Sequence, residues 1–116
     1  MEREKAAKGI LMTAMIAVFG IFGVDKFARP DVWLGWMPPW LADLSGISRE
    51  TWLMITGGIE VFLAAALLFP HRLVRRIAAW GMVAHLIFIL TQTGVNDIFV
   101  RDQGLLLSAV ALAILL

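Results

Sequence analysis

Residues 51–70, TWLMITGGIEVFLAAALLFP, form an apolar run with a single charged residue, Glu60, near its centre. The run is close to the ~20 residues that a helix needs to cross the hydrocarbon core of a bilayer. Ser48 is placed to cap the first turn of such a helix, and Pro70 ends it because a residue before proline resists the helical conformation. The stretch therefore predicts a transmembrane helix over about residues 51–69.

Three more apolar runs of similar length cover about residues 8–27, 77–94 and 98–116. Hydrophobic residues make up 60% of the 116 residues and charged residues 16%, against roughly 45–50% and 25% in soluble domains. A soluble chain of this size would leave large apolar patches in water. We therefore predict an all-α fold with one domain, residues 1–116, built as an integral membrane four-helix bundle. Whether the fourth span is complete stays open.

Basic residues are concentrated at one end of the predicted bundle. Six of the ten Lys and Arg residues lie in the N-terminal segment and the second loop: Arg3, Lys5, Lys8, Arg72, Arg75 and Arg76. Because cytoplasmic segments of membrane proteins are enriched in basic residues, both termini are predicted to be cytoplasmic. The net charge of +1 argues against binding nucleic acid, which requires a concentrated basic surface.

The long first loop, about residues 28–50, is rich in tryptophan and proline. It contains Trp33, Trp36, Trp40 and the pair Pro38-Pro39. Tryptophan favours the boundary between membrane and water. We predict that this loop lies on the outer interface as a short, proline-broken amphipathic segment, which either anchors the bundle or covers a ligand site.

Two ionisable residues fall near the middle of predicted spans, Glu60 in the second and His85 in the third. A charge at the bilayer centre costs about 2.5–3.5 kcal/mol on insertion scales, so Glu60 should face the bundle interior and be protonated or paired. His85 lies at a similar depth on an antiparallel neighbour and is the expected partner. Gly57 and Gly58 precede Glu60 and would let another helix approach closely.

A polar stripe leads from mid-membrane toward the outer end of the third span. His85, Gln92 and Asn96 are spaced by seven and four residues and share one helix face,. More polar residues gather at the same end of the other spans, namely Asp25, Lys26, Arg29, Asp97, Arg101, Asp102 and Gln103. The pattern predicts a polar cavity open toward the outer face and floored by Glu60 and His85. The same residues would equally serve as hydrogen bonds that hold the bundle together.

Two spacings are repeated along the chain. The pairs Asp25/Arg29 and Asp97/Arg101 are each four residues apart and can pair on a helix. In the first span, small residues recur at Gly9, Thr13 and Ala17 and continue with Gly20 and Gly23. Small residues let helices approach in lipid, so this face is expected to pack against another helix.

Three stretches carry a likeness to a known family. They are Gly23-Val24-Asp25-Lys26-Phe27 with Pro30 after it, Gly57-Gly58-Ile59-Glu60 leading to Leu67-Leu68-Phe69-Pro70, and Arg101-Asp102-Gln103-Gly104-Leu105-Leu106. In their order and placement the chain resembles the DoxX family of small bacterial and archaeal four-span membrane proteins. The long first loop departs from the compact members of that family.

The resemblance implies a bacterial or archaeal cytoplasmic (inner) membrane and association with a membrane redox system, in which some relatives are linked with thiosulfate oxidation coupled to quinone. It marks Lys26, Glu60, Arg101 and Asp102 as family-like positions. With His85 and Gln92 from the spacing argument, these six are the expected ligand-binding residues. No metal site is expected, and the catalytic residues are unknown.

The chain carries no self-contained catalytic motif, and the absence of cysteine excludes iron–sulfur clusters within it,. The sequence therefore favours an accessory subunit over a stand-alone enzyme, with no intrinsic cofactor and a quinone or lipid as ligand. Its expected partners are the lipid bilayer and other membrane subunits or further copies of the chain. Two alternatives stay open: a non-catalytic scaffold or assembly factor of a membrane complex, and a small transporter or proton pathway.

Overall fold

The structure is a computed structural model that describes residues 1–93 and 97–116, with side chains described outside residues 93–98. Every regular element in this part of the chain is a helix. The six helices are α1 (Glu2–Ala28), α2 (Pro30–Leu34), α3 (Pro39–Ser45), α4 (Arg49–Leu68), α5 (Arg72–Thr93) and α6 (Asp97–Leu115). The all-α prediction is confirmed for the described residues.

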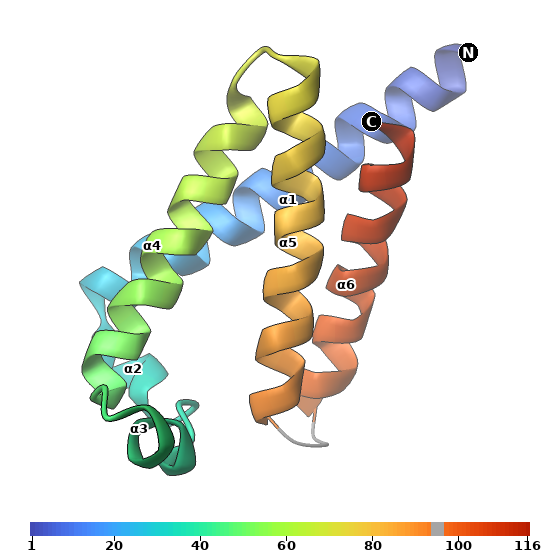
Figure 1. Cartoon of the computed structure of the whole chain (residues 1–116). Helices are drawn as coiled ribbons and strands as arrows, with labels where there is room; N and C mark the ends of the chain where they lie inside the picture. Colours follow the sequence, from blue (N-terminus) through green and yellow to red (C-terminus); the bar gives the residue numbers. More distant parts are fainter. Residues whose placement is uncertain (94–96) are drawn as a thin grey trace.

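Four long helices form a bundle, and the two short helices lie at one end of it (Figure 1). Helices α4, α5 and α6 pack side by side in chain order, and α1 crosses them diagonally, with its largest contact on α4 and a smaller one on α6. Both termini and the α4–α5 turn lie at the end opposite to α2 and α3 (Figure 1). The longest axis of the molecule measures 49 Å.

The ends of α4 follow from local sequence. The Ser48 side chain accepts a hydrogen bond from the backbone N–H of Thr51 at 3.2 Å, which satisfies one of the free donors of the first turn,. The other end is extended at Phe69, directly before Pro70,. Both sequence predictions for this helix are confirmed.

The first loop, predicted as a proline-broken segment, contains two short helices. Pro30 and Pro39 each occupy the first position of a short helix, where the missing N–H of proline leaves no hydrogen bond unmade,. Gly46 ends α3 in the left-handed conformation, at φ 74°, which glycine adopts without strain. The prolines therefore start two helices rather than only breaking a loop.

The predicted spans agree with α4 and α6 within two residues, but α1 and α5 begin earlier than predicted. Helix α1 starts at Glu2 instead of about residue 8, and α5 starts at Arg72 instead of about residue 77. The apolar runs mark only the part of each helix that lacks charge. The charged first turns are helical as well, so hydropathy alone placed these two boundaries too late.

One large apolar side chain from each long helix is completely buried between the site of Glu60 and the terminal end of the bundle. These four residues are Met15, Leu67, Met82 and Leu112, each 0% exposed, and we refer to them as the apolar plug. They belong to one continuous hydrophobic cluster with residues such as Phe19, Leu63 and Ala109. A smaller cluster of Met37, Leu41 and Leu53 attaches the two short helices to α4.

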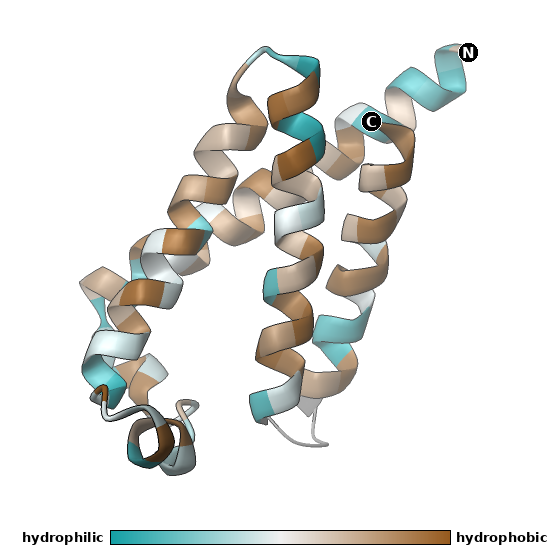
Figure 2. Ribbon diagram, in the orientation of Figure 1, coloured by the Kyte–Doolittle hydropathy of each residue, from teal (hydrophilic) through white to brown (hydrophobic). Residues whose placement is uncertain are grey.

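Three of the described helices are long and apolar enough to cross a membrane, by length and composition: Glu2–Ala28, Arg49–Leu68 and Arg72–Gln92. Figure 2 shows hydrophobic residues along most of these helices, with hydrophilic residues at the N-terminus and at the α4–α5 turn. Within the residues described, the prediction of membrane spans is confirmed at this level for three helices. Helix α6 stays the predicted fourth span.

The small-residue face predicted for α1 is only partly an interface. The buried residues of α1 are Met15, Phe19, Gly23 and Lys26. Gly9, Thr13 and Ala17 lie on another side of the helix and are exposed, and a Cβ on Gly9 would meet nothing within 4 Å. Within this chain, that half of the face therefore packs against no other helix, because the larger residues Met15 and Phe19 select the buried face.

Candidate functional site

Three ionisable side chains from three helices meet in the interior of the bundle. The Lys26 ammonium of α1 donates to Glu60 Oε1 of α4 at 2.5 Å. The second carboxylate oxygen, Glu60 Oε2, lies 3.1 Å from His85 Nε2 of α5. These residues are only 6%, 7% and 7% exposed, respectively. The expected contact between Glu60 and His85 is present, and Lys26 is a second partner that the spacing argument did not identify.

A close crossing of α1 and α4 lets Lys26 reach Glu60. A Cβ on Gly57 would lie 3.1 Å from both the Gly23 carbonyl oxygen and the Lys26 Cβ. The two helices can therefore touch through their backbones, and the stem of Lys26 lies over the surface that Gly57 leaves free. Gly23 and Gly57 each stand three residues before the charged residue that they help to position.

Aromatic rings surround the charged groups. The Lys26 Nζ lies 4.1 Å from the centroid of the Trp33 ring in α2 and 6.0 Å from that of Phe22. Both distances are within the range of cation–π attraction. The rings of Phe19 and His85 are tilted against each other with centroids 5.7 Å apart. The ion pair is thus shielded by aromatic faces as well as by the helices.

Trp33 is held in place by a polar contact at its other edge. Its indole N–H donates to Asp25 Oδ2 at 2.9 Å, and Arg29 donates to both oxygens of the same carboxylate at 2.8 Å. The expected Asp25–Arg29 pair is therefore present. The hydrogen bond to Asp25 raises the pKa of Arg29 above its ordinary value, so this guanidinium keeps its charge and continues to fix the carboxylate that holds Trp33.

A cavity of about 80 Å³ opens next to the ion pair, with room for a few water molecules,. Its walls are mainly apolar and come from four helices: Phe19, Phe22, Leu53, Leu86, Ile89 and Leu105. Residues of the first loop cover it, namely Trp33, Trp36 and Met37. The first loop therefore does more than anchor the bundle, because it forms part of the wall of an interior cavity.

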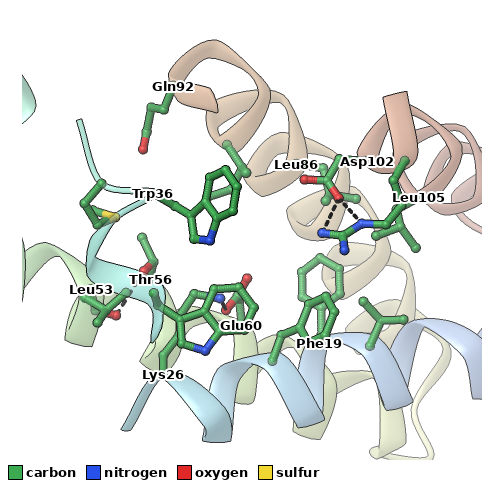
Figure 3. A pocket seen from close by; sticks show the side chains of 16 residues that line it. Phe19, Lys26, Trp36, Leu53, Thr56, Glu60, Leu86, Gln92, Asp102 and Leu105 are labelled. Carbon is green, nitrogen blue, oxygen red and sulfur yellow. Dashed lines mark hydrogen bonds and ion pairs between the residues drawn. The ribbon is translucent and has the colours of Figure 1, made fainter. Parts of the chain in front are cut away.

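The polar residues that line the cavity are Lys26, Thr56, Glu60, Gln92, Arg101 and Asp102. Figure 3 shows side chains from α1, α4, α5 and α6 converging on this one space. Thr56 is satisfied by the Leu53 carbonyl, to which its hydroxyl donates at 3.0 Å. Asp102 is 6% exposed and accepts hydrogen bonds from Arg101 at 3.3 and 3.4 Å.

Gln92 differs from the other polar residues of the cavity. Its Nε2 atom is buried and has no hydrogen-bond partner among the described residues. A buried N–H without a partner is costly, and such groups in native proteins are rare. The described residues therefore leave this donor unsatisfied, and the side chains of residues 93–98 that follow it are not described.

The structure brings five of the six expected ligand-binding residues to the cavity wall: Lys26, Glu60, Gln92, Arg101 and Asp102. His85 does not line the cavity and instead lies behind Glu60, to which it is bonded. The predicted floor of Glu60 and His85 is corrected to Glu60 and Lys26. Asn96 and the side chain of Asp97, which were expected to extend this polar region, fall outside what the structure describes.

The sequence analysis did not identify Phe22, Thr56 or the specific role of Trp33. The pairing of Lys26 with Glu60 had one signal in the sequence, namely a glycine three residues before each charge. No cluster of three or more His, Asp or Glu residues that would hold a metal ion occurs in the described part of the chain. The site is suited to hydrogen bonding with a polar group inside an apolar enclosure.

Residues 15–114 match the model of a family described as a domain of unknown function, DUF8561. The match includes Lys26, Glu60, His85 and Gln92, and it does not assign the chain to the DoxX family. Comparison with curated proteins and with solved structures gives no match. Since the matched segment covers most of the 116 residues, the chain belongs to the DUF8561 family.

Proposed function

We propose that this chain is an integral membrane protein that binds a lipophilic molecule beside Glu60, where the cavity of about 80 Å³ would widen to admit it,. The observation that carries the proposal is the cavity itself, which combines apolar walls with a buried ion pair. Ligand sites are usually concave and mostly apolar, with a few placed polar groups that fix orientation. A buried ion pair is weak evidence for stability, so ligand binding explains its presence better than structural support alone.

The distribution of side chains supports a bilayer as the surrounding medium. Large apolar residues face outward on all four long helices, for example Ile10, Phe62, Ile87 and Leu107, which are 50–70% exposed. The ionisable groups within the helices face inward, as Glu60 does. Water would disfavour this arrangement and lipid favours it. Helices α4, α5 and α6 would be roughly 28–33 Å long, which matches the ~30 Å hydrocarbon core.

The proposed orientation places the termini and the α4–α5 turn in the cytoplasm. That end of the bundle carries the basic residues of the N-terminal segment and of α5, including Arg72 and Arg76, and the positive-inside rule assigns such an end to the cytoplasm. Helices α2 and α3 would then lie at the outer surface of a bacterial or archaeal inner membrane, where Trp36 and Trp40 are half exposed and suited to the interface.

The proposed role is that of an accessory subunit of a membrane redox system, with a quinone as the leading ligand class. The resemblance of its three motifs to the DoxX family supports this role. The lipid-soluble ring of a quinone suits the apolar walls, and its carbonyl oxygens suit the polar groups. Because the chain has no cysteine, any redox centre other than the ligand would belong to a partner protein.

Binding of a short-chain quinone to the purified protein tests the proposal. Glu60→Ala and His85→Ala should weaken binding without preventing membrane insertion, the second through loss of the support that it gives to Glu60. Glu50→Ala and His71→Ala are matched controls, since both residues are exposed and neither lines the cavity. Unchanged quinone affinity in both Glu60→Ala and His85→Ala would reject the site.

A scaffold function has one observation in its favour. The exposed face of Gly9, Thr13 and Ala17 offers a flat surface on which a partner helix would pack in lipid. Isolation from native membranes distinguishes the two functions. A stoichiometric protein partner that is lost in Gly9→Leu would support the scaffold, whereas a protein that carries only a lipophilic ligand would support the binding function.

The transporter alternative is less well supported. Between the cavity and the terminal end of the bundle lie the four residues of the apolar plug, all completely buried. A proton or substrate pathway needs polar groups or water along its length. Proton flux in proteoliposomes that disappears in Glu60→Gln would nevertheless restore this alternative.

A further inference from the structure

We infer that the exposed face of α5 next to the α4–α5 turn binds an anionic phospholipid, with Arg72 and Arg76 holding the phosphate of its head group. In the proposed orientation, this lipid belongs to the cytoplasmic leaflet. The surface shares no residue with the wall of the cavity beside Glu60, so it is a second site that is independent of the ligand proposed there. Two features of α5 support it, namely arginines without an anionic partner and an apolar surface that continues from them.

The two arginines carry positive charge that the described part of the chain does not neutralise. Arg72 and Arg76 are exposed, and neither takes part in an ion pair within the described residues. The first turn of α5 contains no acidic residue. Because the two residues are four positions apart, their side chains are neighbours on one helix face, where like charges repel each other. A phosphate between them would remove this repulsion and accept paired hydrogen bonds from the guanidinium groups.

Arg75, in the same stretch of α5, has a partner within the chain. Its Nε donates to the carbonyl oxygen of Leu67 at 3.1 Å, and its Nη2 donates to that of Leu68 at 3.5 Å. These carbonyls belong to the last turn of α4, where they have no partner inside the helix. Arg75 therefore fastens the end of α4 to α5, whereas no such contact accounts for Arg72 and Arg76.

The positive charge at this end of the bundle is concentrated on α5. The N-terminal segment has two acidic residues, Glu2 and Glu4, among its three basic ones. By contrast, no Asp or Glu occurs between Glu60 and Asp97, and this stretch contains all three arginines of α5. An anionic head group is therefore attracted more strongly to α5 than to the beginning of α1.

An apolar surface continues from the arginines along the same face of α5. Leu73, Ile77 and Trp80 are 59%, 62% and 46% exposed. Figure 2 shows hydrophilic residues at this end of α5 followed by hydrophobic ones toward the middle of the helix. Trp80 follows Arg76 by about one helical turn, roughly 6 Å along the axis, where an indole ring suits the membrane boundary. The face therefore fits a whole lipid, with its phosphate at the arginines and an acyl chain beside Ile77 and Trp80.

Lipid binding to the full-length protein, purified in a neutral detergent, tests the inference. Native mass spectrometry counts bound phosphatidylglycerol and bound phosphatidylcholine with the same acyl chains. The wild type should bind phosphatidylglycerol more tightly. Each arginine near an anionic lipid contributes about fivefold in affinity, so Arg72→Gln/Arg76→Gln should weaken phosphatidylglycerol binding about thirtyfold. Its quinone affinity should not change, because neither arginine lines the cavity.

Arg3→Gln/Lys5→Gln is the matched control, since it removes the same charge from exposed residues at the same end of the bundle. It should keep the phosphatidylglycerol affinity of the wild type. An equal loss in both double variants would mean that net charge alone attracts the lipid, and would overturn the site. Equal binding of the two lipids by the wild type would overturn it as well. Glycerol 3-phosphate has the phosphate without acyl chains, and its displacement of phosphatidylglycerol at equal concentration would reveal a phosphate site and reject a lipid site.

Discussion

The backbone of Gly23 in α1 lies against that of Gly57 in α4, with no room for a side chain between them. A Cβ on Gly23 would stand 2.9 Å from the Gly57 carbonyl oxygen and 2.8 Å from a methyl carbon of Val61. The ion pair between Lys26 and Glu60 is built on this contact, since both residues follow the glycines by one helical turn. A change at this helix crossing should therefore affect both the stability of the bundle and the position of the Lys26–Glu60 ion pair.

Substitution of Gly23 by alanine should force α1 away from α4. The obstacle is backbone as well as side chain, so the helices must separate, and the expected loss in unfolding free energy is about 1–3 kcal/mol. Gly9→Ala is the control on the same helix, because an added Cβ there meets nothing within 4 Å. Denaturant titrations in mixed micelles measure both variants. Equal stability of Gly23→Ala and Gly9→Ala would contradict the close crossing.

The ion pair should be strongly coupled when it is tested by a double-mutant cycle. Lys26→Met alone leaves a buried carboxylate with only His85, and Glu60→Gln alone leaves a buried ammonium, so each should cost about 3–5 kcal/mol in unfolding free energy. The double variant removes both charges and should recover a large part of that loss. Additive losses would mean that the two groups do not interact in the folded protein.

Trp33 should control how long a ligand stays in the cavity. Trp33→Phe keeps an aromatic ring near Lys26 but removes the N–H that donates to Asp25. The loss of about 1 kcal/mol should speed ligand dissociation about fivefold, and Trp33→Leu should speed it further because the cation–π contact is lost as well. Stopped-flow release of decylubiquinone measures the rate.

Trp40→Phe is the control for this series, since Trp40 is 49% exposed and does not line the cavity. Its release rate should equal that of the wild type. If all three variants release the ligand at the same rate, Trp33 does not control ligand release, and the first loop acts only as an anchor.

The orientation in the membrane is accessible because the chain contains no cysteine. Single cysteines replace two exposed acidic residues at opposite ends of the bundle, Glu2 and Asp43. A membrane-impermeant maleimide added to intact cells should label Asp43→Cys and leave Glu2→Cys unlabelled until the membrane is permeabilised. The reverse pattern would invert the orientation, and equal labelling of both would argue against a spanning arrangement.

Most of the helical fold could be predicted from the sequence because its helices are dominated by apolar runs with clear ends. The Ser48 cap and the Pro70 stop fixed α4 within two residues. The early starts of α1 and α5 could not be read from hydropathy, because charged residues such as Arg72 are good helix formers that carry no apolar signal. The prolines of the first loop were ambiguous, since proline both ends and begins helices.

The sequence predicted those contacts of the site that depend only on the depth of two residues in the bundle. Glu60 and His85 sit at equal depth on neighbouring helices, and their contact follows. Lys26 is 34 residues from Glu60, and its contact depends on the crossing of α1 with α4, which hydropathy does not specify. The position of His85 behind the cavity wall could not be predicted either, because it depends on the rotation of α5 about its axis and not on spacing along the helix.

Met15, Leu67, Met82 and Leu112 close the terminal half of the bundle with hydrocarbon, so the cavity exchanges with its surroundings only where the first loop and the other ends of the helices enclose it. A molecule held beside Glu60 would have to leave by the way it came. Such a protein would store or present its ligand and would not carry it across the membrane. The rate of ligand exchange would depend on the opening through which the ligand enters.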